Sequence, residues 1–472
     1  MRLRLIFFAL LLTSCSVGPK YVAPELELPV AYRATAATAA RAWPAAEWWR
    51  GFGSAELDGL IMAAREGNFD IQAALARVRQ ADALLVVSGA GLLPGVSASG
   101  SERWSRSALL GRTRTTESRG VSFGPSVSWE LDFWGRVKAG RDGAAADAVA
   151  SRFDQEAVAL SAVSAVASTW FQALALQDRV MIARRNLADA EAILGAIQAR
   201  AAAGTASLLD VSQQAALVAN IRAQVPALRS QLEGQVTALG LLTGRPPSAV
   251  TVRPGTLAAL SLPEIAPGLP SALLARRPDV AAAEARLVAA NADIRVARAA
   301  FFPQVSLTGA LGWQGLALGT LFGPGSLFAN AALSASQVVF DNGRLGGQAA
   351  YTEARYDELV ANYRRAVVQA FTDVEDGARA YGYATEQEAL VREAVRVAQL
   401  AADIAREQVR AGTSDIVRAL QAQTTLFNAL DLLAEVRLAR FQALLSLYKA
   451  MGGGWARGDV EAPAVRLFQG VL

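Results

Sequence analysis

Hydrophobic residues recur every seven positions along two long stretches of the chain that contain no proline. Between Pro125 and Pro226, the repeating positions are Val166, Ala173, Val180, Leu187 and Leu194. Between Pro324 and Pro463, they are Val360, Val367, Val374, Tyr381, Val395, Ala402 and Val409, with Glu388 as the exception. A strict heptad repeat predicts supercoiled helices. A second stripe, which predicts that the first helix packs on both sides, consists of Phe153, Leu160, Ala167, Leu174 and Met181.

Each helical stretch is interrupted once, at Gly204-Thr205 and at Gly412-Thr413, and the helical pattern resumes directly afterwards. Glycine suits the left-handed conformation that ends a helix, and Thr, Ser or Asp caps the next one. The helices that follow are therefore expected to fold back as antiparallel partners. Taken alone, the heptads favour a self-contained coiled-coil rod.

Four runs of alternating residues lie between the shorter and the longer helices. The clearest, at 121–133 and 305–313, alternate apolar positions with small polar ones, and weaker runs begin at Val96 and Ala329. Segments of about nine to eleven residues with this period are typical of membrane β-strands. A soluble hairpin on a coiled coil is the alternative. Because four strands cannot close a barrel and open edges are unstable in lipid, membrane strands here require several chains to share one barrel.

The chain is an internal duplication. Pro94 matches Pro303 at an offset of 209 residues, and Gly204 matches Gly412 at an offset of 208. Other matching pairs keep the same register between these points, which chance does not produce. The repeated unit of about two hundred residues is too long for a solenoid module.

Composition excludes most catalytic chemistry. The 472 residues are 53% hydrophobic and include no His and one Cys. This excludes His-based triads, His-ligated metal sites, internal disulfides and Cys-rich zinc sites. The 46 Lys and Arg residues nearly balance the 42 Asp and Glu residues, so the charge gives little support for nucleic-acid binding. We therefore expect no enzyme, no metal and no bound cofactor.

The N-terminus has the pattern of a secretory signal. Arg2 and Arg4 precede an apolar run at 5–12, which is too short to span a bilayer that needs about 20 residues. Leu12-Thr13-Ser14-Cys15 resembles a bacterial lipobox, which implies cleavage before Cys15 and its lipidation with diacylglycerol and palmitate. An uncut signal followed by an incidental Cys is the alternative. In similar lipoproteins, a residue other than Asp after the Cys, here Ser16, is associated with sorting to the outer membrane.

Several short strings, in their order along this duplicated scaffold, resemble the trimeric outer membrane efflux channels, or TolC-like family, and within it the NodT-type lipoproteins. The resemblance covers nearly everything after Cys15. The strings are Val17-Gly-Pro-Lys-Tyr-Val-Ala-Pro24, Trp48-Trp49-Arg-Gly-Phe52, Arg276-Arg-Pro-Asp-Val280, Phe302-Pro303, Val339-Phe-Asp-Asn-Gly-Arg344 and Ala411-Gly-Thr-Ser-Asp-Ile-Val417.

The resemblance implies a mainly α protein with a membrane β-barrel, built from a duplicated helix–β-hairpin–helix unit. Its trimer would share a twelve-stranded barrel and form a long α-helical tunnel through the periplasm. The implied function is the outer membrane channel of a tripartite efflux system in a Gram-negative bacterium, a passive conduit for drugs and toxic compounds. The implied partners are a periplasmic adaptor (membrane fusion protein) and an inner membrane RND pump. A periplasmic coiled-coil lipoprotein or adaptor without a pore is the alternative.

The resemblance also assigns roles to the helix–turn–helix tips, which would close the periplasmic aperture and contact the adaptor. These tips contain Gly204, Thr205, Gly412 and Thr413.

Charges near the tips depart from the family pattern. Relatives often carry aspartates at the positions of Arg418 and Gln421, whereas Asp415 precedes them here and Asp210 matches Arg418 in the first repeat. Threefold symmetry would make any such charge a ring able to filter ions or latch the aperture. Helix capping is the favoured alternative for Asp415. For Arg418 and Asp210, a pair between helices is predicted.

Two further groups allow a structural interpretation. Trp129, Trp134 and Trp313 suit an aromatic girdle in the membrane, or equally packing near the junction of barrel and tunnel. Acidic clusters on the second long helix are expected to form a solvated face rather than an acid–base site. They contain Asp373, Glu375, Asp376, Glu386 and Glu388.

The expected organisation follows from these patterns, with a signal peptide at 1–14, a lipidated extended segment at 15–53, an equatorial connector at 246–270 and a tail at 454–472. The first repeat, 54–245, has helices at 56–92, 136–203 and 206–244 and strands within 94–133. The second, 271–453, has helices at 278–301, 343–411 and 414–451 and strands within 303–340.

Overall fold

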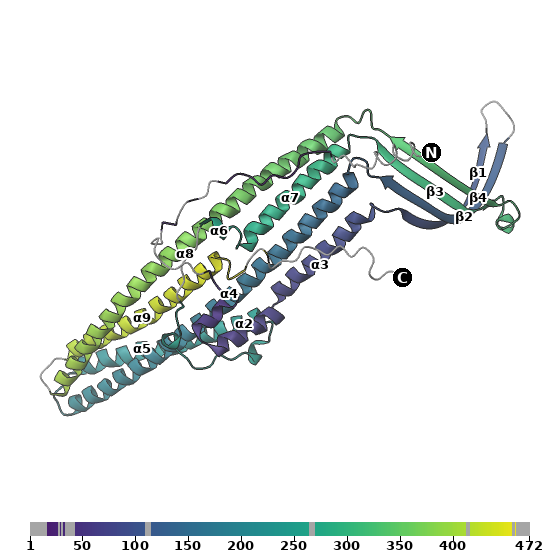
Figure 1. The fold of residues 1–472 in the computed structure, drawn as a ribbon. Helices are drawn as coiled ribbons and strands as arrows, with labels where there is room; N and C mark the ends of the chain where they lie inside the picture. Colours follow the sequence, from purple (N-terminus) through teal and green to yellow (C-terminus); the bar gives the residue numbers. More distant parts are fainter. Residues whose placement is uncertain are drawn as a thin grey trace.

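The computed structural model describes residues 17–26, 29, 32–33, 43–108, 115–263, 270–411, 416–455 and 458. The molecule is elongated, with a β-sheet at one end and two helical hairpins reaching the other end (Figure 1). Cys15 and the predicted signal peptide at 1–14 lie outside the described residues. So do Gly412, Thr413 and Asp415 of the second tip.

The two repeats carry helices of equal length. α3 (Phe69–Ala90) and α7 (Pro278–Ala299) have 22 residues each, and α4 (Arg136–Ala202) and α8 (Arg344–Arg410) have 67. α5 (Leu208–Leu242) and α9 (Ile416–Ala450) have 35. At 1.5 Å per residue, α4 and α8 are each roughly 100 Å long. The shorter helices are η1 (Trp48–Phe52), α2 (Ala55–Gly67), η2 (Pro247–Ala249), η3 (Leu257–Ala259), α6 (Pro270–Leu273) and η4 (Leu318–Thr320).

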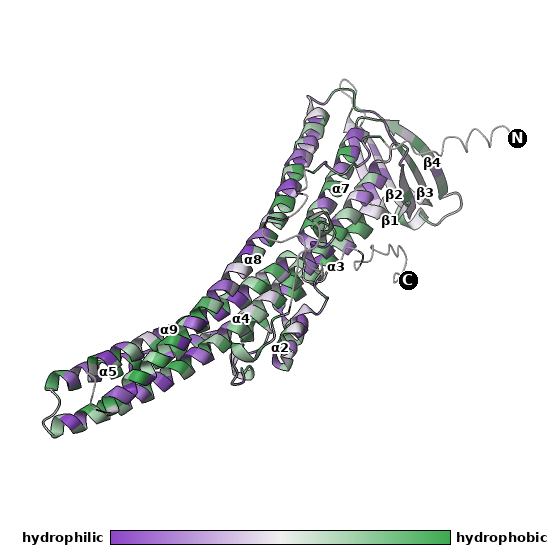
Figure 2. Ribbon diagram, turned by 60° about the vertical axis from the view of Figure 1, so that its left-hand side comes forward, coloured by the Kyte–Doolittle hydropathy of each residue, from purple (hydrophilic) through white to green (hydrophobic). Residues whose placement is uncertain are grey.

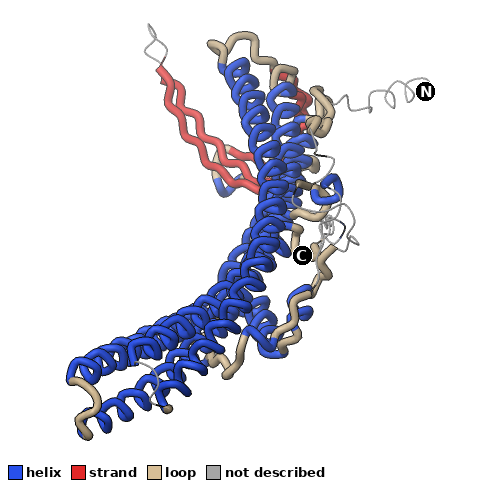
Figure 3. Tube along the Cα trace, turned by 90° about the vertical axis from the view of Figure 1, so that its left-hand side faces the viewer, coloured by secondary structure: helices blue, strands red, loops and turns tan. Residues whose placement is uncertain are grey.

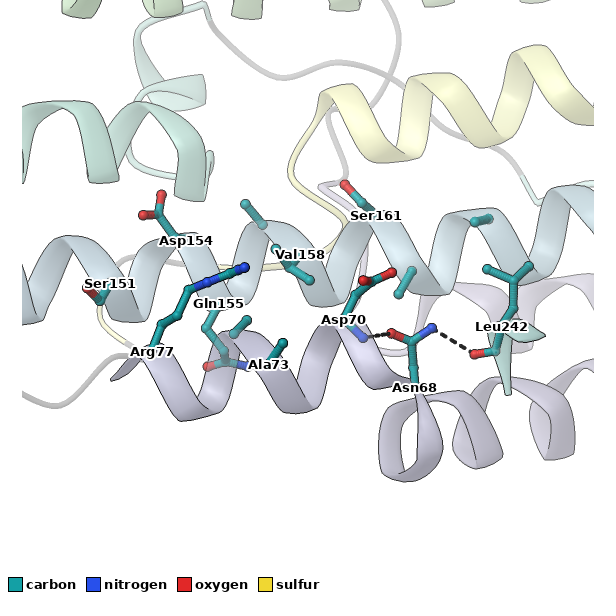
Figure 4. Close-up of a pocket in the computed structure, with 14 residues that line it drawn as sticks. Asn68, Asp70, Ala73, Arg77, Ser151, Asp154, Gln155, Val158, Ser161 and Leu242 are labelled. Atoms are coloured by element: carbon teal, nitrogen blue, oxygen red, sulfur yellow. Dashed lines mark hydrogen bonds between the residues drawn. The ribbon is translucent and has the colours of Figure 1, made fainter. Parts of the chain in front are cut away.

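The region predicted as helical at 56–92 contains two helices, α2 and α3. Asn68 separates them because its backbone leaves the helical region, with φ −66° and ψ 127°. Its side-chain oxygen accepts hydrogen bonds from the N–H groups of Asp70 and Ile71, which caps α3. Its amide nitrogen donates to the Leu242 carbonyl at 2.8 Å, so the break is attached to the end of α5 (Figure 4).

α4 is the central helix and contacts α3, α5, α7 and α9. Its two predicted stripes account for this, since Val166 and Ala167 are fully buried and Phe153 packs against α7. α4 also contains a window apolar enough to cross a membrane, but half of that window is buried inside the molecule. Figure 2 shows hydrophobic and hydrophilic residues interleaved along the long helices. The apolar content of α4 therefore reflects packing among helices.

An aromatic core holds the middle of the molecule together. The Trp48 ring stacks on Tyr448 of α9 at 5.0 Å between centroids. Phe52 contacts Phe171 of α4 at 5.0 Å, and Phe171 contacts Phe441 of α9 at 5.1 Å. The Trp48–Phe52 string therefore serves as an apolar anchor that joins the N-terminal segment to both repeats.

The four strands form one antiparallel sheet in the order β1-β2-β3-β4. The strands are β1 (Gly95–Ala108), β2 (Thr115–Leu131), β3 (Gln304–Gly315) and β4 (Leu327–Ser336). β2 pairs with β3, so the hairpins of the two repeats lie side by side. Figure 3 shows the sheet beside one end of the curved helical bundle.

The β2–β3 pairing leaves no room for a side chain at Gly312. A Cβ there would lie 2.4 Å from the Phe123 carbonyl oxygen and 2.9 Å from Gly124 Cα. We predict that Gly312→Ala destabilises the folded protein by about 1–3 kcal/mol, because backbone cannot yield as a flexible side chain does. Thermal unfolding in detergent, followed by circular dichroism, measures this. Gly309→Ala in the same strand is the control, since its nearest contact is 3.5 Å; equal melting temperatures for both variants would refute the prediction.

Candidate functional site

The strand register divides the sheet into two chemically different faces. Odd-numbered residues 121–131 of β2 share one face with odd-numbered residues of β3 and β4 and even-numbered residues of β1. This apolar face carries mainly Val, Leu, Ala, Phe and Trp, with Glu102 at its outer border. The opposite, polar face carries mainly Ser, Thr, Gly, Ala, Asn and Gln, with Phe328 near its outer end. A sheet of this kind fits between lipid and water.

The height of the apolar face matches a membrane. The rows from Val121 to Leu131, here called the central band, extend about 33 Å along β2 at 3.3 Å per residue. Strands tilted by about 40° would convert this to roughly 25 Å, the apolar height of an outer membrane barrel.

Serine hydroxyls pair across the strands on the polar face. Ser97 and Ser126 oxygens lie 2.9 Å apart, and those of Ser306 and Ser334 lie 2.8 Å apart. Ser101 and Ser122 form a third such pair. These hydroxyls satisfy one another while remaining open to water, so the face presents a hydrated and weakly interacting surface.

The sheet has two open edges. Within the described residues, the outer edges of β1 and β4 pair with no other strand. Unpaired peptide groups cannot persist in hydrocarbon, since each one lacks a hydrogen-bond partner. Two further strands from outside the described chain are therefore required beside β1 and β4.

The opposite end of the molecule contains the first predicted tip. Gly204 adopts a left-handed conformation with φ 75°, and Thr205 donates from its N–H and hydroxyl to the Arg200 carbonyl at 2.9 and 3.0 Å. Ser207 is the N-cap of α5, and its side chain forms a reciprocal capping box with Asp210. The turn is thus closed by local hydrogen bonds, which leaves Leu208 and Leu209 exposed.

The carboxylate of Asp210 is bound by a residue of its own turn. This carboxylate accepts from the N–H and hydroxyl of Ser207 at 2.9 and 2.8 Å, and these bonds lower its pKa. The predicted pair between Asp210 and Arg418 is absent from the ion pairs of the described residues, and Ser207 binds the Asp210 carboxylate. Arg418 and Gln421 lie exposed near the start of α9. Their role at an aperture stays a prediction.

Glu388 contradicts the expected solvated acidic face. Its side chain is only 2% exposed and binds three arginines, Arg392, Arg437 and Arg440, at 2.6, 3.1 and 3.0 Å. Burial alone raises the pKa of Glu388, but hydrogen bonds from Arg440, Arg437 and Arg392 outweigh it and lower the pKa. This exception to the heptad is therefore an ionic contact that joins α8 to α9.

Two other acidic residues of the same predicted face also accept hydrogen bonds. Asp373 accepts a hydrogen bond from Arg277 at 2.7 Å, and Glu375 accepts one from the Arg33 N–H at 2.5 Å. Arg277 is nearly buried and also binds Asp279 and the Ala450 carbonyl. The Arg276–Val280 string therefore attaches the start of α7 to α8 and α9.

Trp129 and Trp134 belong to the junction between sheet and helices. Trp129 donates to the Leu92 carbonyl at 3.2 Å, and Trp134 donates to the Pro303 carbonyl at 2.8 Å while stacking on Phe302. Trp313 lies on the apolar face, as Trp129 does, but near the outer end of β3, where it contacts Phe322 at 5.5 Å. Trp313 at the outer end of the strands and Trp129 at the inner end both lie on the face that a girdle requires, and the assignment stays a prediction.

The described residues of the helical part form cavities but no metal-binding cluster. The described residues contain no group of three acidic or cysteine side chains able to hold a metal ion. One cavity of about 700 Å³ lies between α3 and α4, where Asn68, Arg77 and Asp154 line it among alanines and serines (Figure 4).

Comparison with known proteins agrees with this geometry. Residues 60–245 and 269–453 each match the family described as Outer membrane efflux protein. The pyoverdine export outer membrane protein OpmQ of Pseudomonas aeruginosa is 38% identical over 96% of this chain and 97% of its own length. The outer membrane protein OprJ of the same species is 32% identical over 96% of each. The solved outer-membrane channel OprN superposes with a TM-score of 0.86 at 28% identity, covering 93% of this chain and 100% of its own.

The Glu388 cluster yields a stability prediction. Glu388→Gln would leave three arginines without a counter-charge, and loss of one partner of a buried pair costs about 3–5 kcal/mol. Glu393→Gln, in an exposed pair with Arg396, is the control and should cost less than about 1 kcal/mol. Chemical unfolding at pH 7 compares them.

The stability that Glu388 contributes should depend on pH in a definite direction. Because the pKa of Glu388 is lowered in the folded state, its contribution is complete above the ordinary glutamate pKa of about 4.3 and disappears as the pH falls through the folded value. The stability difference between wild type and Glu388→Gln should shrink below about pH 4.3. A difference that is constant down to pH 3 would contradict this assignment.

Proposed function

Because the chain belongs to the outer membrane efflux protein family and is an outer membrane channel component of an efflux system, we propose that three copies close one twelve-stranded barrel and extend it as a helical tunnel. The observation that carries this proposal is the two-faced sheet with open edges. Joining β1 of one copy to β4 of the next satisfies every edge without any further strand. The apolar face then meets lipid, and the serine-rich polar face lines the lumen.

The helices continue the wall away from the membrane. Each repeat gives one long helix and one shorter pair to the tunnel, and the equal helix lengths make the repeats nearly equivalent wall segments. At roughly 100 Å, α4 and α8 are long enough to cross much of a periplasm. The exposed tips at Gly204 and Thr205 would then meet a periplasmic adaptor, and an inner membrane RND pump would supply the energy.

The cargo is proposed to be small molecules carried passively. OpmQ is named for pyoverdine export, and a conduit of similar construction suits compounds of that kind. A hydrated wall of small polar side chains binds nothing tightly, so selection belongs to the pump, and no enzymatic step is assigned to the chain. In a periplasmic spacer without a pore, a sheet that is apolar on one face over about 25 Å would expose that face to water, which is unfavourable.

Conductance measurements test the proposed channel function. Purified protein in planar bilayers should give stepwise currents, and mild detergent should preserve a trimer that crosslinking detects. Deletion of the chromosomal copy should lower export of the cargo, with restoration by the wild-type gene as the control. A monomer without conductance would favour the spacer.

We also propose that Cys15 carries the lipid anchor. Gly18 packs against Arg295, where an added Cβ would lie 2.9 Å from Cγ. Arg295 lies four residues before α7 ends, and β3 begins at Gln304. Three residues of extended chain reach about 10 Å, so a lipid on Cys15 would lie close to the membrane level of the sheet.

Cys15→Ala tests the anchor. The variant should incorporate no labelled palmitate, yet it should still form a trimer, since barrel closure and not the lipid drives assembly. Cleavage and labelling are read from the mass of the mature N-terminus. Ser14→Ala, which keeps the thiol, is the control. Palmitate in the Cys15→Ala variant would refute the anchor.

A further inference from the structure

The polar face of the sheet is almost free of charge. Among the described residues of the central band, Glu130 of β2 is its only charged side chain. Glu130 lies opposite Ser306 in the register, and Ser306 lies opposite Ser334, so all three share this face. Glu130 is also one residue from the end of β2, at the junction with the helices. Within the central band, a single acidic position therefore marks the inner mouth of an otherwise neutral wall; Arg103 of β1, opposite Gly120, lies on the same face one row beyond the outer border of the band.

Arg136, the first residue of α4, neutralises this carboxylate. Its Nε donates to Glu130 Oε1 at 3.0 Å, and its second nitrogen donates to Oε2 at 2.5 Å, a two-point contact. Both side chains stay partly exposed, at 34% for Arg136 and 28% for Glu130. They border a cavity of about 590 Å³ together with Ser128, Ser306 and Val296. The pair thus remains accessible from the polar side of the junction.

Two neighbouring aspartates are engaged in helix caps. The carboxylate of Asp132 accepts from the N–H groups of Val137 and Lys138 at 3.0 and 2.8 Å, which caps the start of α4. Asp341 caps α8 in the same way through the N–H groups of Gly343 and Leu345. The capping aspartate is thus common to both repeats and explains the first turn of each long helix.

Glu130, in contrast, occurs in one repeat only. With the capping aspartates aligned, the residue that matches Glu130 is Val339, which is exposed. Arg344 matches Arg136 when Gly135-Arg136 is aligned with Gly343-Arg344, which lie one residue closer to the capping aspartate; it is 67% exposed and lies 3.9 Å from Asp341. The pairing of a glutamate on the strand with an arginine on the helix is therefore specific to the first repeat and would occur three times in a trimer.

We propose that the Glu130–Arg136 pair determines the charge selectivity of the barrel mouth, as a collar of three neutral ion pairs that admits cations and anions alike. This inference rests on the proposed trimeric barrel. Loss of either partner would place three like charges at one level of the lumen. A ring of like charges in a confined pathway attracts counter-ions and repels ions of its own sign.

Reversal potentials in planar bilayers test this with potassium chloride gradients near 0.1 M, where the Debye length is about 10 Å. Arg136→Gln exposes Glu130 and should raise the potassium-to-chloride permeability ratio by about threefold or more. Glu130→Gln exposes Arg136 and should lower the ratio by a similar factor. The double variant should return to the wild-type ratio, a restoration that a purely structural role would not produce.

Arg106→Gln is the matched control. Arg106 and Glu117 also form an arginine–glutamate pair, at 3.6 Å, but they lie on the apolar side of the same hairpin beyond the central band. Its loss should leave the permeability ratio unchanged. If Arg136→Gln fails to insert, the exchange variant Glu130→Arg/Arg136→Glu, which keeps the pair, replaces it and should match wild type.

The outcomes separate the two proposals. Absence of conductance in wild-type protein would refute the barrel itself. Normal conductance with equal permeability ratios in wild type and both single variants would refute the collar while leaving the channel intact. A ratio change in Arg106→Gln as large as that in Arg136→Gln would also refute it, because any charge on the hairpin would then suffice.

Discussion

Peptide groups at the edge of a β-sheet need hydrogen-bond partners, and hydrocarbon supplies none. In this chain the constraint acts on β1 and β4, whose outer edges are unpaired within the described residues. The apolar face makes a lipid environment favourable, and the open edges make the isolated chain unsuited to it. Assembly with further copies resolves this conflict, and a closed ring of strands in turn obliges the attached helices to form a ring. The tunnel is thus a consequence of how the sheet is completed.

The helices satisfy a different requirement, because a long wall one helix thick has little core. Small residues such as Ala167 and Ala183 let α4 approach its neighbours closely, and the aromatic core around Phe171 joins both repeats at mid-length. Buried ion pairs add positional specificity. Val180 of α4 and Glu388 of α8 occupy matching positions in the two helical hairpins. The first hairpin packs there through Val180, whereas in the second Glu388 binds three arginines. Equivalent positions of a duplicated unit thus use different chemistry to hold the same geometry.

Several predictions at single residues depended on the surroundings of the side chain. The first tip and the long helices were predictable because Gly204 and the heptads act locally, through backbone conformation and spacing. The split of the helix at Asn68 has a local signal too, Gly67-Asn68, which the overall apolar pattern obscured. The burial of Glu388 had a signal in its heptad position, but its arginine partners on α9 lie 49 and 52 residues away. Trp129 and Trp134 were ambiguous for the same reason, since their carbonyl partners come from other elements.

The sequence by itself determined the duplication, the helix and strand pattern, the two faces of each strand and the requirement for several chains, because periodicity is a local property that any single segment carries. Only the tertiary structure decided the strand order, with β2 beside β3, and the pairing of Glu130 with Arg136, Arg277 with Asp373 and Glu388 with its arginines. These depend on which distant segments meet. The sequence does not show whether a charged residue is solvated or paired with a buried partner. Only its neighbours in the folded chain distinguish these two cases.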